Sequence, residues 1–197
     1  MRVLLKTGLS CLLALIACIG FSSPSGAVQV GDKAPAFSLT DLDGSTHSLA
    51  DEAGNVVFLF FFGYQQNIDV CRTPAQDIEH RFHQGAQYRG LTILGIDCFD
   101  NAESAQQFQS LTGVQFPLLL AGKATMQSYD VSYNSFVVVD GTGTVTYVSS
   151  GPDLSAYDAN GLDTAIRQAM QDAADTRDQT WGQIKSLYNA SKSKSLR

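Results

Sequence analysis

Residues 56–62 read VVFLFFF, an unbroken apolar run that is short for a helix and rich in β-formers. Such a run predicts a strand that is buried on both faces of a sheet. Residues 91–97 (LTILGID) and 136–140 (FVVVD) repeat the pattern, and helical stretches separate the three runs. This order of elements predicts an α/β fold with a mixed central sheet and helices on both faces.

The segments around these strands supply the remaining elements. Residues 36–49 alternate about a turn at 41–44, which predicts an N-terminal β-hairpin. Thr73 and Pro74 have the pattern of a helix cap and a first helical position, so we predict a helix from there to about Tyr88. We further predict helices at 103–111, 124–129, 162–173 and 180–189, and strands at 116–120 and 145–148.

Composition limits the class of protein. The chain has 197 residues, of which 44% are hydrophobic and 16% charged, as in an ordinary globular protein. With 13 Lys and Arg against 19 Asp and Glu, it lacks the basic face of a nucleic-acid-binding protein. We predict one domain over residues 28–172, followed by a C-terminal helical extension and tail over 173–197.

Residues 1–27 have the composition of a secretory signal. Arg2 and Lys6 precede an apolar stretch at 9–21, and residues 25–27 (SGA) are small, as at a cleavage site. We predict a signal peptide cleaved after residue 27 and a periplasmic or secreted protein. Residues 15–18 (LIAC) resemble a lipoprotein box, so the alternative is a lipoprotein anchored at Cys18, which would be its one contact with a membrane. A retained membrane anchor is the third alternative.

Removal of the signal leaves two cysteines, Cys71 and Cys98, in an oxidising compartment. Cys71 lies where a central strand ends and a helix starts, next to Arg72, and both features lower the pKa of a thiol. Asp69 acts in the opposite direction. We predict Cys71 as a nucleophile and Arg72 as the residue that supports its thiolate. The alternative is an inert, half-buried cysteine.

Cys98 follows the strand predicted at 91–97. If that strand lies parallel to 56–62, both cysteines reach the same edge of the sheet, at the spacing of about 4.8 Å between neighbouring strands. This spacing is compatible with a Cys71–Cys98 disulfide, in which Cys98 is the resolving thiol. A small apolar side chain in a loop is the alternative.

Several motifs carry a family resemblance. Residues 30–39 (VGDKAPAFSL) resemble the opening of the extracytoplasmic thioredoxin-like and peroxiredoxin proteins, including the AhpC/TSA and TlpA-like families. Residues 61–64 (FFGY) and 69–71 (DVC) resemble the Sco/SenC copper-assembly family, which reads FFGYTxCPDVCP here. Residues 129–131 and 136–143 resemble the later strand and hairpin of these proteins. The resemblance covers roughly residues 28–172 and implies a thioredoxin-like fold.

The active-site motif departs from each of these families. Asn67 stands where the Sco family has its first cysteine, and residues 131–135 contain no histidine, so copper binding is doubtful and no cofactor is expected. Ile68 stands at the first cysteine of a thioredoxin motif, and Asn134 lies about where its cis-proline would be. Tyr64 and Ile68 replace the proline and the Ser/Thr of the peroxiredoxin motif.

The leading hypothesis is therefore an exported thiol redox enzyme that acts on a peroxide or on a disulfide of a protein partner through Cys71 and Cys98. The alternative is a degenerate Sco-like protein that handles copper or an oxidase-assembly partner, or a binding domain without catalysis.

For three further patterns we prefer a structural explanation to a functional one. His80 and His83 could share a helix face with Glu79, but Glu79/His83 and Asp77/Arg81 are ordinary i,i+4 pairs and predict a solvated helix rather than a metal site. His47 has no evident partner. Trp181, Ile184 and Tyr188 form an apolar stripe at helical spacing. We expect this stripe to pack on the domain, and the alternative is that it binds in a groove of a partner protein.

Overall fold

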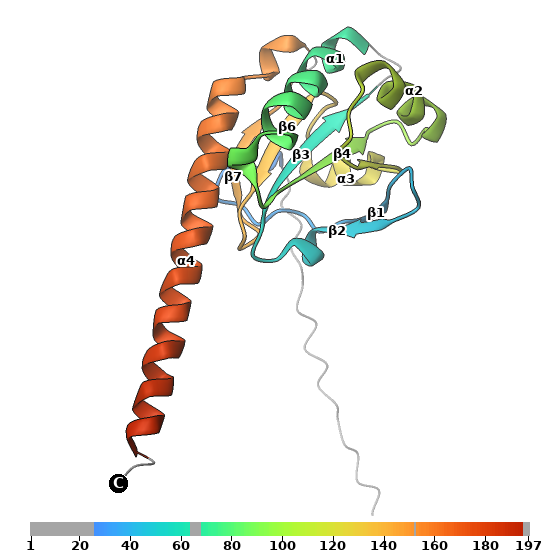
Figure 1. The fold of residues 1–197 in the computed structure, drawn as a ribbon. Coiled ribbons are helices and arrows are strands. Elements are labelled where there is room, and N and C mark those ends of the chain that lie inside the picture. The colour runs from blue at the N-terminus through green and yellow to red at the C-terminus, as the bar shows by residue number, and fades with distance from the viewer. Residues whose placement is uncertain (1–25, 64–67, 152, 195–197) are drawn as a thin grey trace, which may run out of the picture.

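The computed structural model describes residues 26–63, 68–151 and 153–194. Its centre is a five-stranded sheet with the order β5-β4-β3-β6-β7 (Figure 1). Strands β3, β4 and β5 are parallel, and β6 and β7 are antiparallel to their neighbours. The strands span β3 Val56–Phe62, β4 Leu91–Asp97, β5 Leu118–Leu119, β6 Ser135–Val139 and β7 Val145–Ser149. The mixed α/β sheet is confirmed.

A two-stranded hairpin precedes this sheet, as predicted, and consists of β1 Ser38–Thr40 and β2 Thr46–Ser48. The α-helices are α1 Ile68–Asp77, α2 Ala102–Thr112, α3 Lys123–Tyr129 and α4 Ala159–Lys194. A π-helical segment, Ile78–His83, continues α1. Short 3₁₀ turns lie at Leu49–Glu52, Ala86–Tyr88 and Leu154–Ala156.

The core lies on both faces of β3, because side chains of a strand alternate between the faces of its sheet. Phe58, Phe60 and Phe62 point to one face, where they pack with residues of α1, α2 and α4. Leu59 and Phe61 point to the other face, in a cluster that also holds Tyr129 at the end of α3. All seven residues of β3 are buried, which explains why the strand has no polar positions.

Helix α1 starts earlier than predicted. It begins at Ile68, and Thr73 and Pro74 lie inside it rather than at its cap. The reason is a buried apolar stripe at helical spacing, which consists of Cys71, Ala75, Ile78 and Phe82. Its first residue, Cys71, precedes Pro74, so the helix must start before the proline. Burial of this stripe outweighs the one hydrogen bond that a proline removes from a helix.

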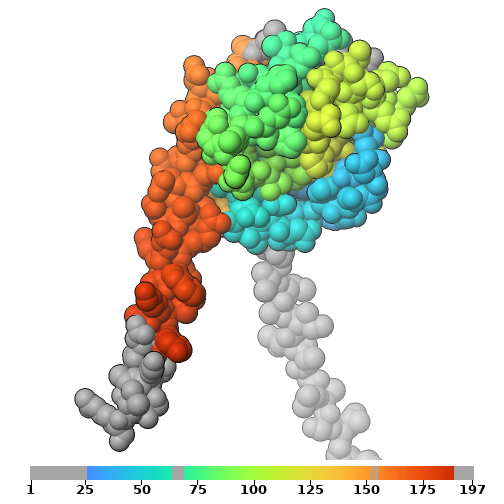
Figure 2. Space-filling view, in the orientation of Figure 1, coloured from blue at the N-terminus to red at the C-terminus, as the bar shows by residue number. Residues whose placement is uncertain are grey.

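Helix α4 is one continuous helix of 36 residues, about 54 Å long, where the sequence predicted two. It crosses the predicted boundary at residue 172 without a break. Its first half packs on β3, β6 and β7 and buries Leu162, Ile166 and Ala169. Its second half leaves the body of the domain (Figure 2). The expectation that the stripe at Trp181 and Ile184 packs on the domain is therefore wrong, because this part of α4 has no domain beneath it.

Among the residues described, none of the helices combines the length and the hydropathy that a crossing of the bilayer needs. The predicted signal lies outside this range, except for residues 26 and 27.

Candidate functional site

The predicted site residues lie at the carboxyl end of β3 and β4. The register pairs Phe62 of β3 with Asp97 of β4, so the chain leaves both strands at the same edge of the sheet, as predicted. Gly63 and Cys98 are the next residues on each strand. The amide of Cys98 donates a hydrogen bond of 3.0 Å to the carbonyl of Phe62 and continues the ladder by one residue. Cys98 is thereby held beside the start of the connection to α1.

Cys71 is in the first turn of α1, with no exposed surface. Its thiol donates a long hydrogen bond, 3.8 Å from sulfur to oxygen, to the carbonyl of Gly63. Burial raises the pKa of the Cys71 thiol, and the bond to Gly63 offsets only part of this effect. The prediction of a lowered pKa at Cys71 is therefore wrong in this structure, because removal from water raises it.

Arg72 forms an ion pair within α1. Its guanidinium lies 3.8 Å from the carboxylate of Asp69, one turn earlier on α1. Its Nε is buried and has no hydrogen-bond partner among the described residues. The structure thus places Arg72 next to Cys71 in sequence but in an ion pair with Asp69, and its catalytic role stays a prediction.

Cys98 is buried as deeply as Cys71 but in the cluster on the opposite face of the sheet. Its sulfur lies 3.6 Å from the carbonyl oxygen of Ile96. Burial, with a smaller contribution from the neighbouring Asp97, raises its pKa well above the ordinary value. Both thiols are free in this structure, so the Cys71–Cys98 disulfide also stays a prediction.

Position 63 requires a glycine because the ring of Phe99 packs directly against it. A Cβ atom added at Gly63 would lie 2.1 Å from Cε2 of Phe99, which no ordinary packing allows. The ring of Phe99 in turn lies 6.0 Å from that of Tyr133, centroid to centroid. A half-buried aromatic pair therefore covers the strand end that holds the two cysteines.

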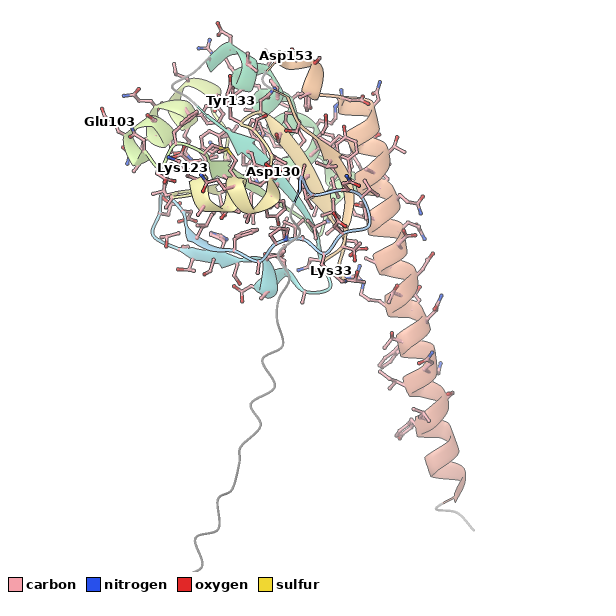
Figure 3. The ribbon with its side chains drawn as sticks, turned by 180° about the vertical axis from the view of Figure 1, so that it is seen from behind. Lys33, Glu103, Lys123, Asp130, Tyr133 and Asp153 are labelled. Carbon is pink, nitrogen blue, oxygen red and sulfur yellow. The ribbon has the colours of Figure 1, made fainter. Side chains whose placement is uncertain are left out.

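Asn134 occupies the loop before β6 at the same edge. Its amide donates to the carbonyl of Phe61 at 2.6 Å, and its backbone is left-handed with a φ of 61°. Its side-chain Nδ2 donates to the carbonyl of Asp153 at 2.5 Å, while Oδ1 is buried without a partner among the described residues. Tyr133 and Asp153 mark this end of the domain, opposite Lys33 (Figure 3). The described chain contains no cis peptide, so Asn134 does not reproduce a cis-proline turn.

Sequence reasoning missed Asp97, a buried carboxylate directly before Cys98. It accepts hydrogen bonds from the amides of Phe99 and Asn101, yet burial raises its pKa. An acidic residue at the end of a strand whose last five residues are buried was the available signal. Asp97 fixes the loop that follows β4 and with it the position of Cys98.

The histidines fall outside this site. His83 pairs with Glu79 at 2.9 Å, as predicted, although Glu79 is buried rather than solvated. His47 does have a partner, because Asp41 lies 2.7 Å away across the hairpin. In residues 26–63, 68–151 and 153–194, no three His, Cys, Asp or Glu side chains are close enough to share a metal ion. Tyr64 and Asn67 of the motif lie outside the described residues.

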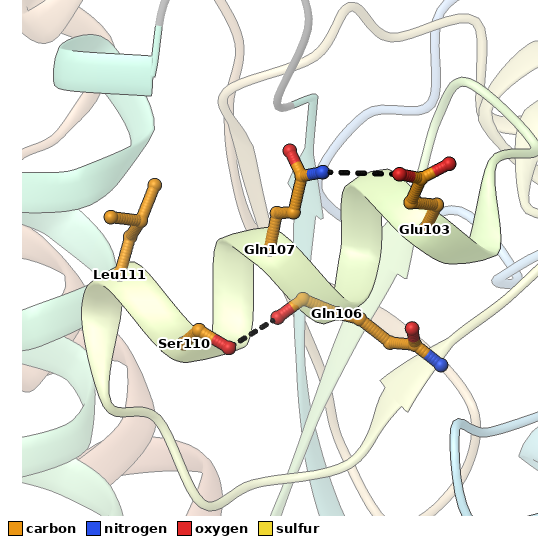
Figure 4. Close-up of a pocket in the computed structure, with 5 residues that line it drawn as sticks. All are labelled: Glu103, Gln106, Gln107, Ser110 and Leu111. Carbon is orange, nitrogen blue, oxygen red and sulfur yellow. Dashed lines mark hydrogen bonds between the residues drawn. The ribbon is translucent and has the colours of Figure 1, made fainter.

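A hollow of about 540 Å³ lies along the outer face of α2 (Figure 4). It is lined by Glu103, Gln106, Gln107, Ser110 and Leu111. It contains neither cysteine, so we do not assign it to the candidate site.

Comparison with known proteins identifies the family of this chain. Residues 30–148 match the AhpC/TSA family. Thiol-disulfide oxidoreductase ResA from Geobacillus kaustophilus is 28% identical over 160 residues, which cover 76% of this chain and 88% of that protein.

Two solved structures are similar in fold alone. One is a thiol:disulfide interchange protein DsbE from Chlorobium tepidum, with a TM-score of 0.59 and 21% identity, covering 75% of this chain and 99% of that one. The other is a peroxiredoxin-like protein from Aquifex aeolicus, with a TM-score of 0.60 and 15% identity, covering 73% and 88%. The fold is thioredoxin-like, of the peroxiredoxin and thiol-disulfide oxidoreductase type, and the chain belongs to the AhpC/TSA family.

Proposed function

We propose that this protein is an exported thiol–disulfide oxidoreductase in which Cys71 and Cys98 cycle between a dithiol and a disulfide. The observation that carries the proposal is that both cysteines donate hydrogen bonds to consecutive carbonyls where β3 ends, the Cys98 amide to Phe62 and the Cys71 thiol to Gly63. The similarity to ResA over most of the chain supports the same class of reaction. Export is supported by the composition of residues 1–27.

The reaction balances with a partner disulfide as the oxidant. The Cys71 thiolate attacks one sulfur of the partner and releases the other as a thiol, which leaves a mixed disulfide. The Cys98 thiolate then attacks the Cys71 sulfur and releases the second partner thiol. Two electrons pass from the cysteine pair to the partner, and the two thiol protons end on the two partner thiols. No organic cofactor takes part.

The burial of both thiols supports a protein disulfide, rather than a peroxide, as the substrate. A buried thiol with a raised pKa has little thiolate at neutral pH and reacts slowly with a small oxidant such as peroxide. Exchange with a protein disulfide can be faster, because a bound partner supplies contacts that open the edge around Gly63 and Phe99. We therefore place a protein disulfide ahead of a peroxide as the substrate.

The test is the intact mass of the mature protein recovered from its native compartment, after thiol blocking, with and without prior reduction. We expect a chain that begins at residue 28, with no blocked thiol before reduction and two blocked thiols after it. Two freely blocked thiols in the unreduced protein would overturn the redox cycle. Hydrogen peroxide added to the reduced protein distinguishes the substrates, since rapid oxidation of Cys71 would favour the peroxide.

A further inference from the structure

The second half of α4 is an exposed helix with large apolar side chains. Every side chain described from Asp175 to Tyr188 is exposed. Trp181, Ile184 and Leu187 are 65%, 51% and 71% exposed, which is unusual for side chains of this size. We call these three residues the distal stripe. Tyr188, 64% exposed, follows it.

The distal stripe continues the face of α4 that docks on the sheet. Ile184 follows the fully buried Ile166 by 18 residues, and Leu187 follows the buried Ala169 by the same number. Eighteen residues make five turns at about 3.6 residues per turn, so each pair shares one direction around the helix. The two apolar segments therefore lie on the same side of the helix, with Thr176, Arg177 and Thr180 between them. The distal stripe lies about 27 Å beyond the part that the domain covers.

This end of the helix is a weak helix former. It contains Thr180, Gly182 and Asn189, all of which favour other conformations in water. An isolated helical segment of such length and composition is marginal in water. A surface that takes up the apolar face would stabilise it.

The charge of this segment is opposite to that of the domain. Residues 175–197 contain five cations and two acids, which leaves eight cations against 17 acids in the rest of the chain, and four of the five cations lie past Asp178, where no acid follows. The four cations are Lys185, Lys192, Lys194 and Arg197. A basic amphipathic helix with aromatic residues on its apolar side has the composition of a helix that lies in a membrane interface.

We infer that the second half of α4 binds the surface of an anionic lipid bilayer. The distal stripe enters the boundary of the acyl chains, with Trp181 at the level of the headgroups, and the cations contact the lipid phosphates. The inference does not depend on the redox function proposed above.

A second copy of the chain fits these observations less well. Three or four side chains present on the order of 500 Å², below the roughly 800 Å² per partner of a stable protein interface. Pairing of two such segments would also bring eight cations together. A bilayer needs no minimum contact area, because each apolar side chain is buried independently. An anionic bilayer also attracts the cations that two copies of the segment would bring together.

The attachment would hold the cysteines away from the lipid. Strands β3 and β4 run toward the end of the domain opposite the free end of α4 (Figure 1). The acidic domain is repelled by the anionic surface to which the basic segment binds. The edge that carries Cys71 and Cys98 therefore faces the surrounding solution, where a protein partner can reach it.

Trp181 is the one tryptophan of the chain, so its fluorescence reports the stripe directly. The full chain, in the form that the producing cell releases, is titrated with vesicles of phosphatidylcholine and phosphatidylglycerol in equal parts, and with vesicles of phosphatidylcholine alone. We expect a blue shift of the emission, quenching by lipids brominated on the acyl chain, and a gain of helical circular dichroism with the anionic vesicles only. Binding should weaken steeply with added salt.

Two variants remove the two halves of the interaction. Ile184→Ser with Leu187→Ser should abolish the blue shift. Neutralisation of Lys185, Lys192 and Lys194 to Gln should weaken partitioning on the order of 100-fold, since each cation near an anionic surface contributes about fivefold. Residues 1–27 contribute equally to every protein compared, because none of the variants changes them.

Matched controls leave α4 intact. Leu111→Ser removes an apolar side chain that is 47% exposed on α2, and neutralisation of Lys33, Arg89 and Lys123 to Gln removes three cations of the domain. Neither should change binding. Unchanged emission of Trp181 with anionic vesicles would overturn the inference. A blue shift without vesicles that grows with protein concentration would overturn it in favour of a second copy.

Discussion

The thiol of Cys71 and the amide of Cys98 are hydrogen-bonded to consecutive carbonyls of the chain, those of Gly63 and Phe62. The two cysteines are 27 positions apart in the sequence and belong to core clusters on opposite faces of the sheet. One strand end therefore positions both. A change at this strand end should alter the surroundings of both thiols together.

Gly63→Ala tests this relationship directly. The new Cβ would meet the ring of Phe99 at 2.1 Å, so the ring must move. We expect the free energy of unfolding to fall by about 1–3 kcal/mol in urea titrations, and alkylation of both cysteines to become faster. Gly182→Ala is the control, since a Cβ there has no neighbour within 4 Å among the described residues, and it should not lower the free energy of unfolding. Equal stability of the two variants would show that Phe99 swings aside without cost.

The reactivity of Cys71 should be that of a buried thiol. Burial raises its pKa above the ordinary value of 9.0, so its rate of alkylation by iodoacetamide should still be rising above pH 9. At pH 7.5 we expect it to react at least tenfold more slowly than a surface thiol introduced by Leu111→Cys. Peptide mass spectrometry resolves the two sites. A rate for Cys71 that levels off below pH 8 would instead show a stabilised thiolate.

Glu79 should make the stability dependent on acid pH. Burial acts to raise the pKa of Glu79, but hydrogen bonds from the Gln115 amide and the side chains of His83 and Gln84 outweigh it and lower the pKa. The folded chain therefore prefers the carboxylate. This contribution is complete above the unfolded pKa, ordinarily 4.5, and is lost as the pH falls through the lower folded value.

Glu79→Gln checks the sign of this effect. We expect a loss of about 1–3 kcal/mol in the free energy of unfolding at pH 7, because a charged acceptor of three hydrogen bonds is removed. The difference from the unsubstituted protein should shrink as the pH falls below 4.5. Glu103→Gln, at an exposed position of α2, should show no such dependence. A difference that is constant with pH would contradict the lowered pKa of Glu79.

Tyr157 should hold α1 in place. Its hydroxyl donates to the carboxylate of Asp77 at 2.5 Å and so joins the segment before α4 to the end of α1. Tyr157→Phe should lower the free energy of unfolding by about 1 kcal/mol and raise the alkylation rate of Cys71, which α1 carries. In Tyr133→Phe the lost hydroxyl has no hydrogen bond to a described residue, and the stability should not change. Equal effects of the two substitutions would exclude a special role for the bond to Asp77.

Local pattern was sufficient for the sheet. Residues 56–62 are apolar throughout and residues 91–97 are largely apolar, and runs of that length are typical of central strands, so both strands have the predicted bounds. The same reasoning located the hairpin and α2 closely, because each is bounded by its own turn or cap residues. The motifs at residues 30–39, 61–71 and 129–143, taken in their order, were sufficient for the fold family.

Properties of the site depended on contacts between segments distant in sequence. The chemistry of Cys71 follows from how completely β3, α1 and α2 exclude water from it, and desolvation by distant residues leaves no local pattern. The start of α1 depended on burial of a stripe that overrides the cap signal at Thr73. The exposure of Trp181 depended on where the sheet ends beneath α4. Periodicity shows that a helix has an apolar face, but only the packing of the whole chain decides whether protein or solvent meets that face.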